Sequence, residues 1–167
     1  MKNNIKSLCF LGLFTALAMV LSYVEAILPP IWSAVPGIKI GLPNIIIIFL
    51  LYRFSVKYAA AVSLVRILLS ALLFGNAVSL LYSLGGAVLS IVIMLVLKKT
   101  ERFSMVGVSA IGGVCHNLGQ ILVAMLVLET AEIGYYMIVL SVTGTVAGVL
   151  VGILGSLVTR YMDKVKM

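Results

Sequence analysis

The sequence has very little charge. Only 10% of its 167 residues are Asp, Glu, Lys or Arg, whereas 63% are hydrophobic and the mean hydropathy is +1.26. A soluble domain carries roughly a quarter charged residues, so a chain of this length could not cover its surface in water with so few. The sequence therefore predicts an integral membrane protein, in one domain of residues 1–167, and excludes most classes of soluble enzyme.

Residues that carry metal or cofactor chemistry are also scarce. Cys9 and Cys115 lie far apart in apolar stretches, without the spacing of a zinc, haem or redox motif. The single aspartate is Asp163, whereas a magnesium–diphosphate site needs several clustered oxygen ligands. No GxxxxGKS/T loop is present for ATP hydrolysis. We therefore expect no catalytic residue, no metal and no cofactor, and expect the energy for any active process to come from another subunit or a gradient.

Long apolar runs are what the sequence has in abundance. A helix needs about 20 apolar residues to cross roughly 30 Å of hydrocarbon at 1.5 Å per residue. Five runs are long, and one, residues 43–54, is too short to cross by itself. The six runs are residues 7–28, 43–54, 58–74, 78–97, 104–128 and 135–159. They predict an all-α bundle of six transmembrane helices.

The basic residues predict the orientation of this bundle. Lys39 falls on one side and Arg66 falls inside a span, while the other ten of the twelve basic residues share the opposite side. Cytoplasmic loops carry the excess of Lys and Arg, so both termini are expected in the cytoplasm of a multi-pass plasma-membrane protein. The net charge of +7 then reflects topology and requires no nucleic acid. The ten are Lys2, Lys6, Arg53, Lys57, Lys98, Lys99, Arg102, Arg160, Lys164 and Lys166.

Several polar residues lie inside the spans, where an ionisable group costs at least about 2.5 kcal/mol and needs a partner. Arg66 is at the middle of the third span and His116 at the middle of the fifth. Asn117 follows directly, and Gln120 shares a helix face with His116 because the two are four residues apart. Two interpretations stay open. These residues line an outward-facing pocket, or they satisfy one another in interhelical contacts.

The external segment of residues 29–44, PPIWSAVPGIKIGLPN, is the second candidate region. It contains Lys39, the one external basic residue, and ends at Asn44, where a short helix begins. Backbone N–H groups at a helix start together with a lysine favour an anion, so the segment could be a lid over the pocket. Glu25, near the outer end of the first span, could pair with Arg66 or contact a ligand. The alternative is an interfacial loop that only connects two helices.

Small residues recur every four positions on two of the spans. The last span has Gly144, Gly148, Gly152 and Ser156, and the first has Gly12 with Ala16 and Ala18 with Ser22. Such faces let helix backbones approach closely in lipid. They favour packing within the chain or, for the first span, docking of a second membrane subunit.

Four stretches carry a resemblance to a known family. PGIKIGLPN at 36–44, VRILLSALLFG at 65–75, SLGGAVLS at 83–90 and GGVCHNLGQILVA at 112–124 occur in order along nearly the whole chain. In these the sequence resembles the Gx transporter, or heptaprenyl diphosphate synthase component I, family. More distantly, in size, span number and the spacing of small residues, it is similar to the S components of energy-coupling factor (ECF) transporters.

That resemblance implies a substrate-binding subunit that takes up a vitamin-like or precursor small molecule, with a transmembrane coupling subunit and an ATPase pair as partners. S components dock through an Ala-xxx-Ala pattern on the first helix, and the nearest equivalents here are Gly12, Ala16, Ala18 and Ser22. The expected substrate-binding residues, which come from the polar-residue argument, are Glu25, Lys39, Asn44, Arg66, His116, Asn117 and Gln120.

Two other functions fit the same residues. One is a membrane component of isoprenoid, quinone or flavin-based extracellular redox metabolism, which would need a separate redox carrier because haem and iron–sulfur motifs are missing. The other is a standalone channel or secondary carrier, which the hydropathy does not favour because it shows no inverted repeat.

Overall fold

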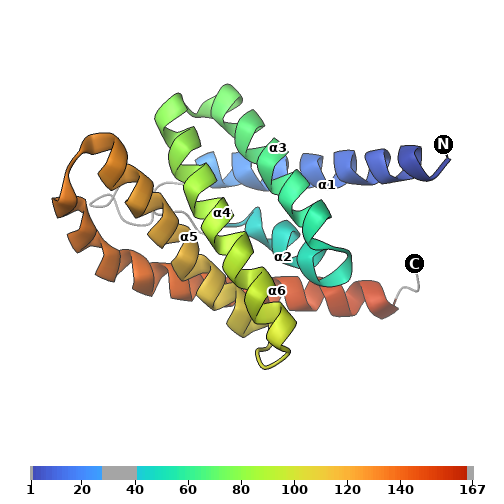
Figure 1. Ribbon diagram of the computed structural model, residues 1–167. Helices are drawn as coiled ribbons and strands as arrows, with labels where there is room; N and C mark the ends of the chain where they lie inside the picture. Colours follow the sequence, from blue (N-terminus) through green and yellow to red (C-terminus); the bar gives the residue numbers. More distant parts are fainter. Residues whose placement is uncertain (1, 28–40, 165–167) are drawn as a thin grey trace.

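The computed structural model describes residues 2–27 and 41–164, and within them it is helical with short links and no strand (Figure 1). Five helices are long and apolar enough to cross a membrane, while α2, with 10 residues, is not. The prediction of an all-α, membrane-type protein is confirmed. The elements are α1 (Lys2–Ile27), α2 (Asn44–Arg53), α3 (Val56–Phe74), α4 (Ala77–Thr100), α5 (Met105–Leu128), the 3₁₀ helix η1 (Ala131–Tyr136) and α6 (Met137–Lys164).

Local sequence signals set several helix ends. α4 begins with a capping box, in which the Ser79 N–H donates to Asn76 Oδ1 at 2.8 Å and the Asn76 N–H donates to Ser79 Oγ at 3.0 Å. The Ser104 hydroxyl accepts from the Gly107 N–H at 3.2 Å and caps α5. These caps satisfy backbone donors that have no partner inside the helix, so the turns before α4 and α5 are defined locally.

The start of α1 and the end of α6 lie at the same end of the bundle (Figure 1). The end of α2 and the end of α4 also lie at this end of the bundle, as two contacts show. Lys98, at the end of α4, donates to the Leu51 carbonyl of α2 at 2.5 Å, and Arg53 Nε lies 3.4 Å from Asp163 Oδ1 of α6. We call this the basic end, because Lys6, Arg53, Lys57, Lys98, Lys99, Arg102, Arg160 and Lys164 lie on the helix termini and links that meet there.

The short helix α2 lies inside the protein. Its residues Ile47, Ile48, Phe49, Leu50 and Leu51 are each at most 2% exposed, and α2 contacts α1, α3, α5 and α6. A helix that is apolar on all sides is stable only when it is buried. Because the middle of α2 contacts protein and not lipid, the helix does not have to span the full hydrocarbon thickness by itself.

Glycines allow very close contact among α4, α5 and α6. A Cβ at Gly148 of α6 would lie 2.5 Å from the Ser109 carbonyl oxygen, and one at Gly152 would lie 2.8 Å from Val106 Cα, both on α5. A Cβ at Gly119 of α5 would lie 2.5 Å from the Gly85 oxygen of α4. The interpretation of the α6 stripe as packing within the chain is confirmed.

The predicted docking residues of α1 divide between two faces. Gly12 and Ala16 are exposed, and a Cβ at Gly12 would meet nothing within 4 Å. Ala18 is 0% exposed and Ser22 is 7% exposed, because their face of α1 packs into the bundle. The expectation that Ala18 and Ser22 form part of a docking surface is therefore corrected, since a partner cannot reach them.

Candidate functional site

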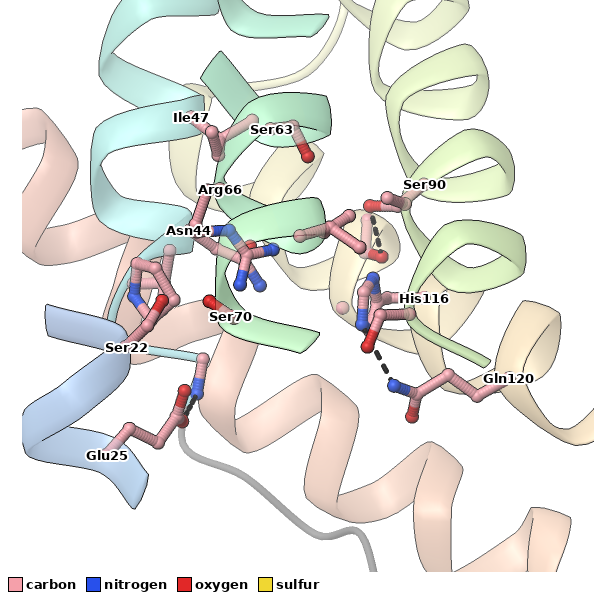
Figure 2. Close-up of a pocket in the computed structure, with 18 of the residues that line it drawn as sticks. Ser22, Glu25, Asn44, Ile47, Ser63, Arg66, Ser70, Ser90, His116 and Gln120 are labelled. Atoms are coloured by element: carbon pink, nitrogen blue, oxygen red, sulfur yellow. Dashed lines mark hydrogen bonds between the residues drawn. The ribbon is translucent and has the colours of Figure 1, made fainter. Parts of the chain in front are cut away.

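A cavity of about 170 Å³ lies between the helices. Figure 2 shows several of the side chains that line it. All six α-helices contribute to its wall. The lining extends from Glu25 and Gly75, at the end opposite the basic end, to Met94 of α4 and Ser109 of α5. We call this space the polar cavity.

The polar cavity brings together six of the seven predicted binding residues, which come from four different helices. The seventh, Lys39, lies outside the described residues. The six are Glu25, Asn44, Arg66, His116, Asn117 and Gln120. The sequence predicts this shared location from the positions of the residues along their spans. That they bind a substrate stays a prediction.

Arg66 has a buried hydrogen-bond donor without a partner among the described residues. It extends from α3 into the cavity in the direction of His116 on α5 (Figure 2). Its Nε is buried and has no hydrogen-bond partner among the described residues, and none of their carboxylates lies within ion-pairing distance of it. A buried charged donor without an acceptor is strongly unfavourable in a membrane protein. The position of Arg66 therefore favours an acceptor supplied from inside the cavity.

Glu25 holds the segment that leads into α2. Its Oε1 accepts a hydrogen bond from the Gly41 backbone N–H (Figure 2). Gly41 has φ +78°, a left-handed conformation that suits glycine, and a Cβ there would lie 3.1 Å from Asn44 Nδ2. The carboxylate thus joins the end of α1 to the start of α2 at the rim of the polar cavity.

The start of α2 differs from the prediction. The N–H groups of Asn44, Ile45 and Ile46 donate to the carbonyls of Gly41, Leu42 and Pro43 at 2.9, 3.1 and 3.1 Å. The turn before the helix has satisfied these donors, so they cannot also hold an anion. The expectation of free N–H groups at this helix start is therefore wrong. The sequence showed a helix start but not the turn geometry that precedes it.

The polar residues of α5 have two different roles. Asn117 donates through Nδ2 to the Leu140 carbonyl of α6 at 2.6 Å, so its amide joins two helices. His116 and Gln120 instead contact each other, with 3.3 Å between His116 Nε2 and Gln120 Nε2. In this arrangement the Gln120 amide donates and His116 Nε2 accepts, which leaves the proton of a neutral imidazole on Nδ1. The interhelical interpretation suits Asn117, and the pocket interpretation suits His116 and Gln120.

Serines are the lining residues that the sequence analysis missed. Ser22, taken above for a docking residue, has a buried Oγ with no hydrogen-bond partner among the described residues. Ser90 donates to the Gly112 carbonyl at 2.8 Å, and Ser70 donates to Met19 Sδ at 3.6 Å. The signal was helical spacing, because serines three, four or seven positions from another polar residue share its face. The lining serines are Ser22, Ser63, Ser70, Ser79, Ser83, Ser90 and Ser109.

Comparison with known proteins identifies the family of the chain. No curated protein and no solved structure matches it. One family model does, over residues 14–158, which is most of the chain and includes every described residue of the polar cavity. The protein therefore belongs to the heptaprenyl diphosphate synthase component I family.

Proposed function

We propose that this chain is the substrate-binding S component of an ECF-type transporter. It captures a vitamin-like or precursor small molecule from outside the cell, and a transmembrane coupling subunit with an ATPase pair supplies the energy. The observation that carries the proposal is the polar cavity, enclosed by six helices and containing two buried polar atoms, Arg66 Nε and Ser22 Oγ, without protein partners among the described residues. Buried polar atoms of this kind are normally hydrogen-bonded, so a ligand is the natural partner.

The charge distribution supports uptake from outside. Basic residues gather at the basic end, while Glu129 and Glu132 lie at the far end, beyond α5. By the positive-inside rule the basic end faces the cytoplasm, with both termini, in the plasma membrane. The polar cavity then opens outward. In this topology the chain crosses the bilayer six times, five times as a long helix and once through the connection between α1 and α3, which contains the short helix α2.

The exposed face of α1 supports a membrane partner. Gly12 and Ala16 leave a shallow strip there, and large apolar side chains flank it, with Leu8 70% exposed and Leu13 57% exposed. A strip of small residues lets a second helix approach closely in lipid. We assign this strip to the coupling subunit.

We also propose that the chain has no catalytic role, although the family description names a synthase component. The sequence contains one aspartate, Asp163, and the described residues include no group of three His, Cys, Asp or Glu side chains that could hold a metal. Diphosphate chemistry through magnesium needs such a group.

A second function is a membrane component of isoprenoid, quinone or flavin-based extracellular redox metabolism, and the family description supports its isoprenoid part. A cavity of about 170 Å³ is too small for a prenyl chain or a quinone tail. The partners of the chain distinguish the two functions.

The test is co-purification of the tagged chain with its own coupling module after mild solubilisation. We expect a membrane coupling subunit and ATPases in a fixed ratio, measured by mass spectrometry. Gly12→Leu should remove these partners, and Val142→Leu, on an exposed face of α6, should retain them. Prenyl-transfer or redox proteins in place of the coupling module would favour the second function.

A further inference from the structure

The charged residues around the polar cavity balance one another. Among the described residues, the wall contains one cation, Arg66, and one carboxylate, Glu25. The other polar groups are seven serines, two asparagines, one glutamine and the imidazole of His116, which accepts a hydrogen bond as a neutral ring does. Across the described residues, the wall that a ligand meets therefore has no net charge.

Net charge inside a bundle surrounded by lipid is costly, because neither hydrocarbon nor the protein interior solvates it well. A diphosphate or other multiply charged anion would face a single guanidinium and a nearby carboxylate. A molecule without net charge avoids this cost. It can still offer an oxygen acceptor to Arg66 Nε and a hydrogen-bonding group to Ser22 Oγ, the two wall atoms that have no hydrogen-bond partner among the described residues.

The volume of the polar cavity limits the ligand to a small molecule. Pockets for drug-sized ligands enclose about 300–1,000 Å³, and a cavity of about 150 Å³ holds a benzene molecule. At about 170 Å³, the space enclosed by the described residues fits one ring with its substituents.

We infer that the solute bound by this protein is a compact molecule of about one ring, without net charge, which presents a carbonyl-type acceptor to Arg66. This inference rests on the proposed function for the view that the polar cavity is a binding site. It goes further by excluding prenyl diphosphates, free diphosphate and other anions as the cargo.

The test uses three pyridine probes of nearly the same shape and different charge: nicotinamide, which is neutral, nicotinate, an anion, and 1-methylnicotinamide, a cation. Binding to the full-length solubilised protein is measured by isothermal titration calorimetry. We expect nicotinamide to bind at least about tenfold more tightly than either charged probe, because a buried unpaired charge costs more than 1.4 kcal/mol. A preference for nicotinate, or no binding by any of the three, would overturn the inference.

Two charge variants make the test specific. Glu25→Gln leaves Arg66 unbalanced, so the preference should shift towards nicotinate, and Arg66→Gln should shift it towards 1-methylnicotinamide. The matched controls are Glu129→Gln, which removes an exposed carboxylate near the end of α5, and Arg53→Gln, which removes an arginine at the basic end. Both controls should keep the wild-type order. If the controls change the order as much as Glu25→Gln and Arg66→Gln do, the discrimination does not come from the polar cavity.

The compound retained through purification provides a second measurement, by extraction and mass spectrometry. A neutral one-ring compound that Arg66→Gln loses supports the inference, and a retained anion or prenyl compound overturns it. The inference and the proposed function fail on different outcomes. An anion found in a complex with the coupling module would overturn the inference alone. A neutral compound in a protein without that module would overturn the transporter proposal alone.

Discussion

The two sides of the bundle are held together in different ways. On the α4–α5–α6 side, backbones touch through glycines such as Gly119 and Gly148, where an added Cβ would lie 2.5 Å from a carbonyl oxygen of the next helix. On the α1–α2–α3 side, aromatic rings fill the space, with the Phe10 and Phe14 centroids 4.5 Å apart and those of Phe14 and Phe49 5.6 Å apart. Rings can repack after a change, but backbones in contact cannot. The first side is therefore a rigid wall and the second an adjustable one, with the polar cavity between them.

The largest effect should come from filling a glycine contact in the rigid wall. Gly148→Leu would drive a side chain into the Ser109 carbonyl, so α5 and α6 must separate, at a cost of about 3 kcal/mol or more. For a chain of this length that is a fall in Tm of roughly 6–12 °C, which thermal unfolding in detergent measures. Gly12→Leu is the matched control and should leave the Tm unchanged, because nothing lies within 4 Å of its Cβ position. Equal losses in the two variants would contradict the comparison.

An intermediate effect is expected on the adjustable side. Phe14→Ala removes ring contacts with Phe10 and Phe49, each worth about 0.5–1.5 kcal/mol. Because neighbouring rings can move into the space, the free energy of unfolding should fall by about 2 kcal/mol, less than for Gly148→Leu. Phe14→Leu should recover part of the loss. A Phe14→Ala protein less stable than Gly148→Leu would show that the aromatic side is not the adjustable one.

A smaller effect separates the two roles on α5. Asn117→Ala removes the hydrogen bond to the Leu140 carbonyl and should lower the free energy of unfolding by about 1 kcal/mol. The double variant His116→Ala with Gln120→Ala should keep the stability and lose the retained ligand. For each variant, thermal unfolding measures the stability, and mass spectrometry measures the amount of retained ligand. Collapse of the fold in the His116 and Gln120 variants would assign these residues to interhelical contacts instead.

The smallest effect is expected at the basic end. Asp163→Asn breaks the ion pair with Arg53. The Arg53 side chain is 41% exposed and the Asp163 side chain is 57% exposed. Exposed pairs contribute about 0.2–1 kcal/mol and are screened by salt. The loss of stability should therefore be near 0.5 kcal/mol at low salt and disappear at high salt in thermal unfolding. A loss that persists in high salt would mean that Asp163 holds α6 by something other than charge.

Much of the polar cavity could be predicted from the sequence, because depth in a membrane follows from position along a span. Arg66 and His116 are both near mid-span, so they lie at similar depth. Rotation about the helix axis could not be predicted in the same way. For that reason the sequence predicts an outer face for Ser22, which lines the polar cavity, and groups Asn117 with His116, although the Asn117 amide contacts α6.

Composition, run length and charge counted along the chain are enough to predict the class of protein, the long helices and the separation of basic from acidic ends. The position of α2, the covered face of α1 and the turn at Gly41 that satisfies the first donors of α2 become known only from the packed bundle. The physical reason is that helical spacing relates residues within one helix, whereas contacts between helices depend on rotations and turns that only the packed bundle fixes.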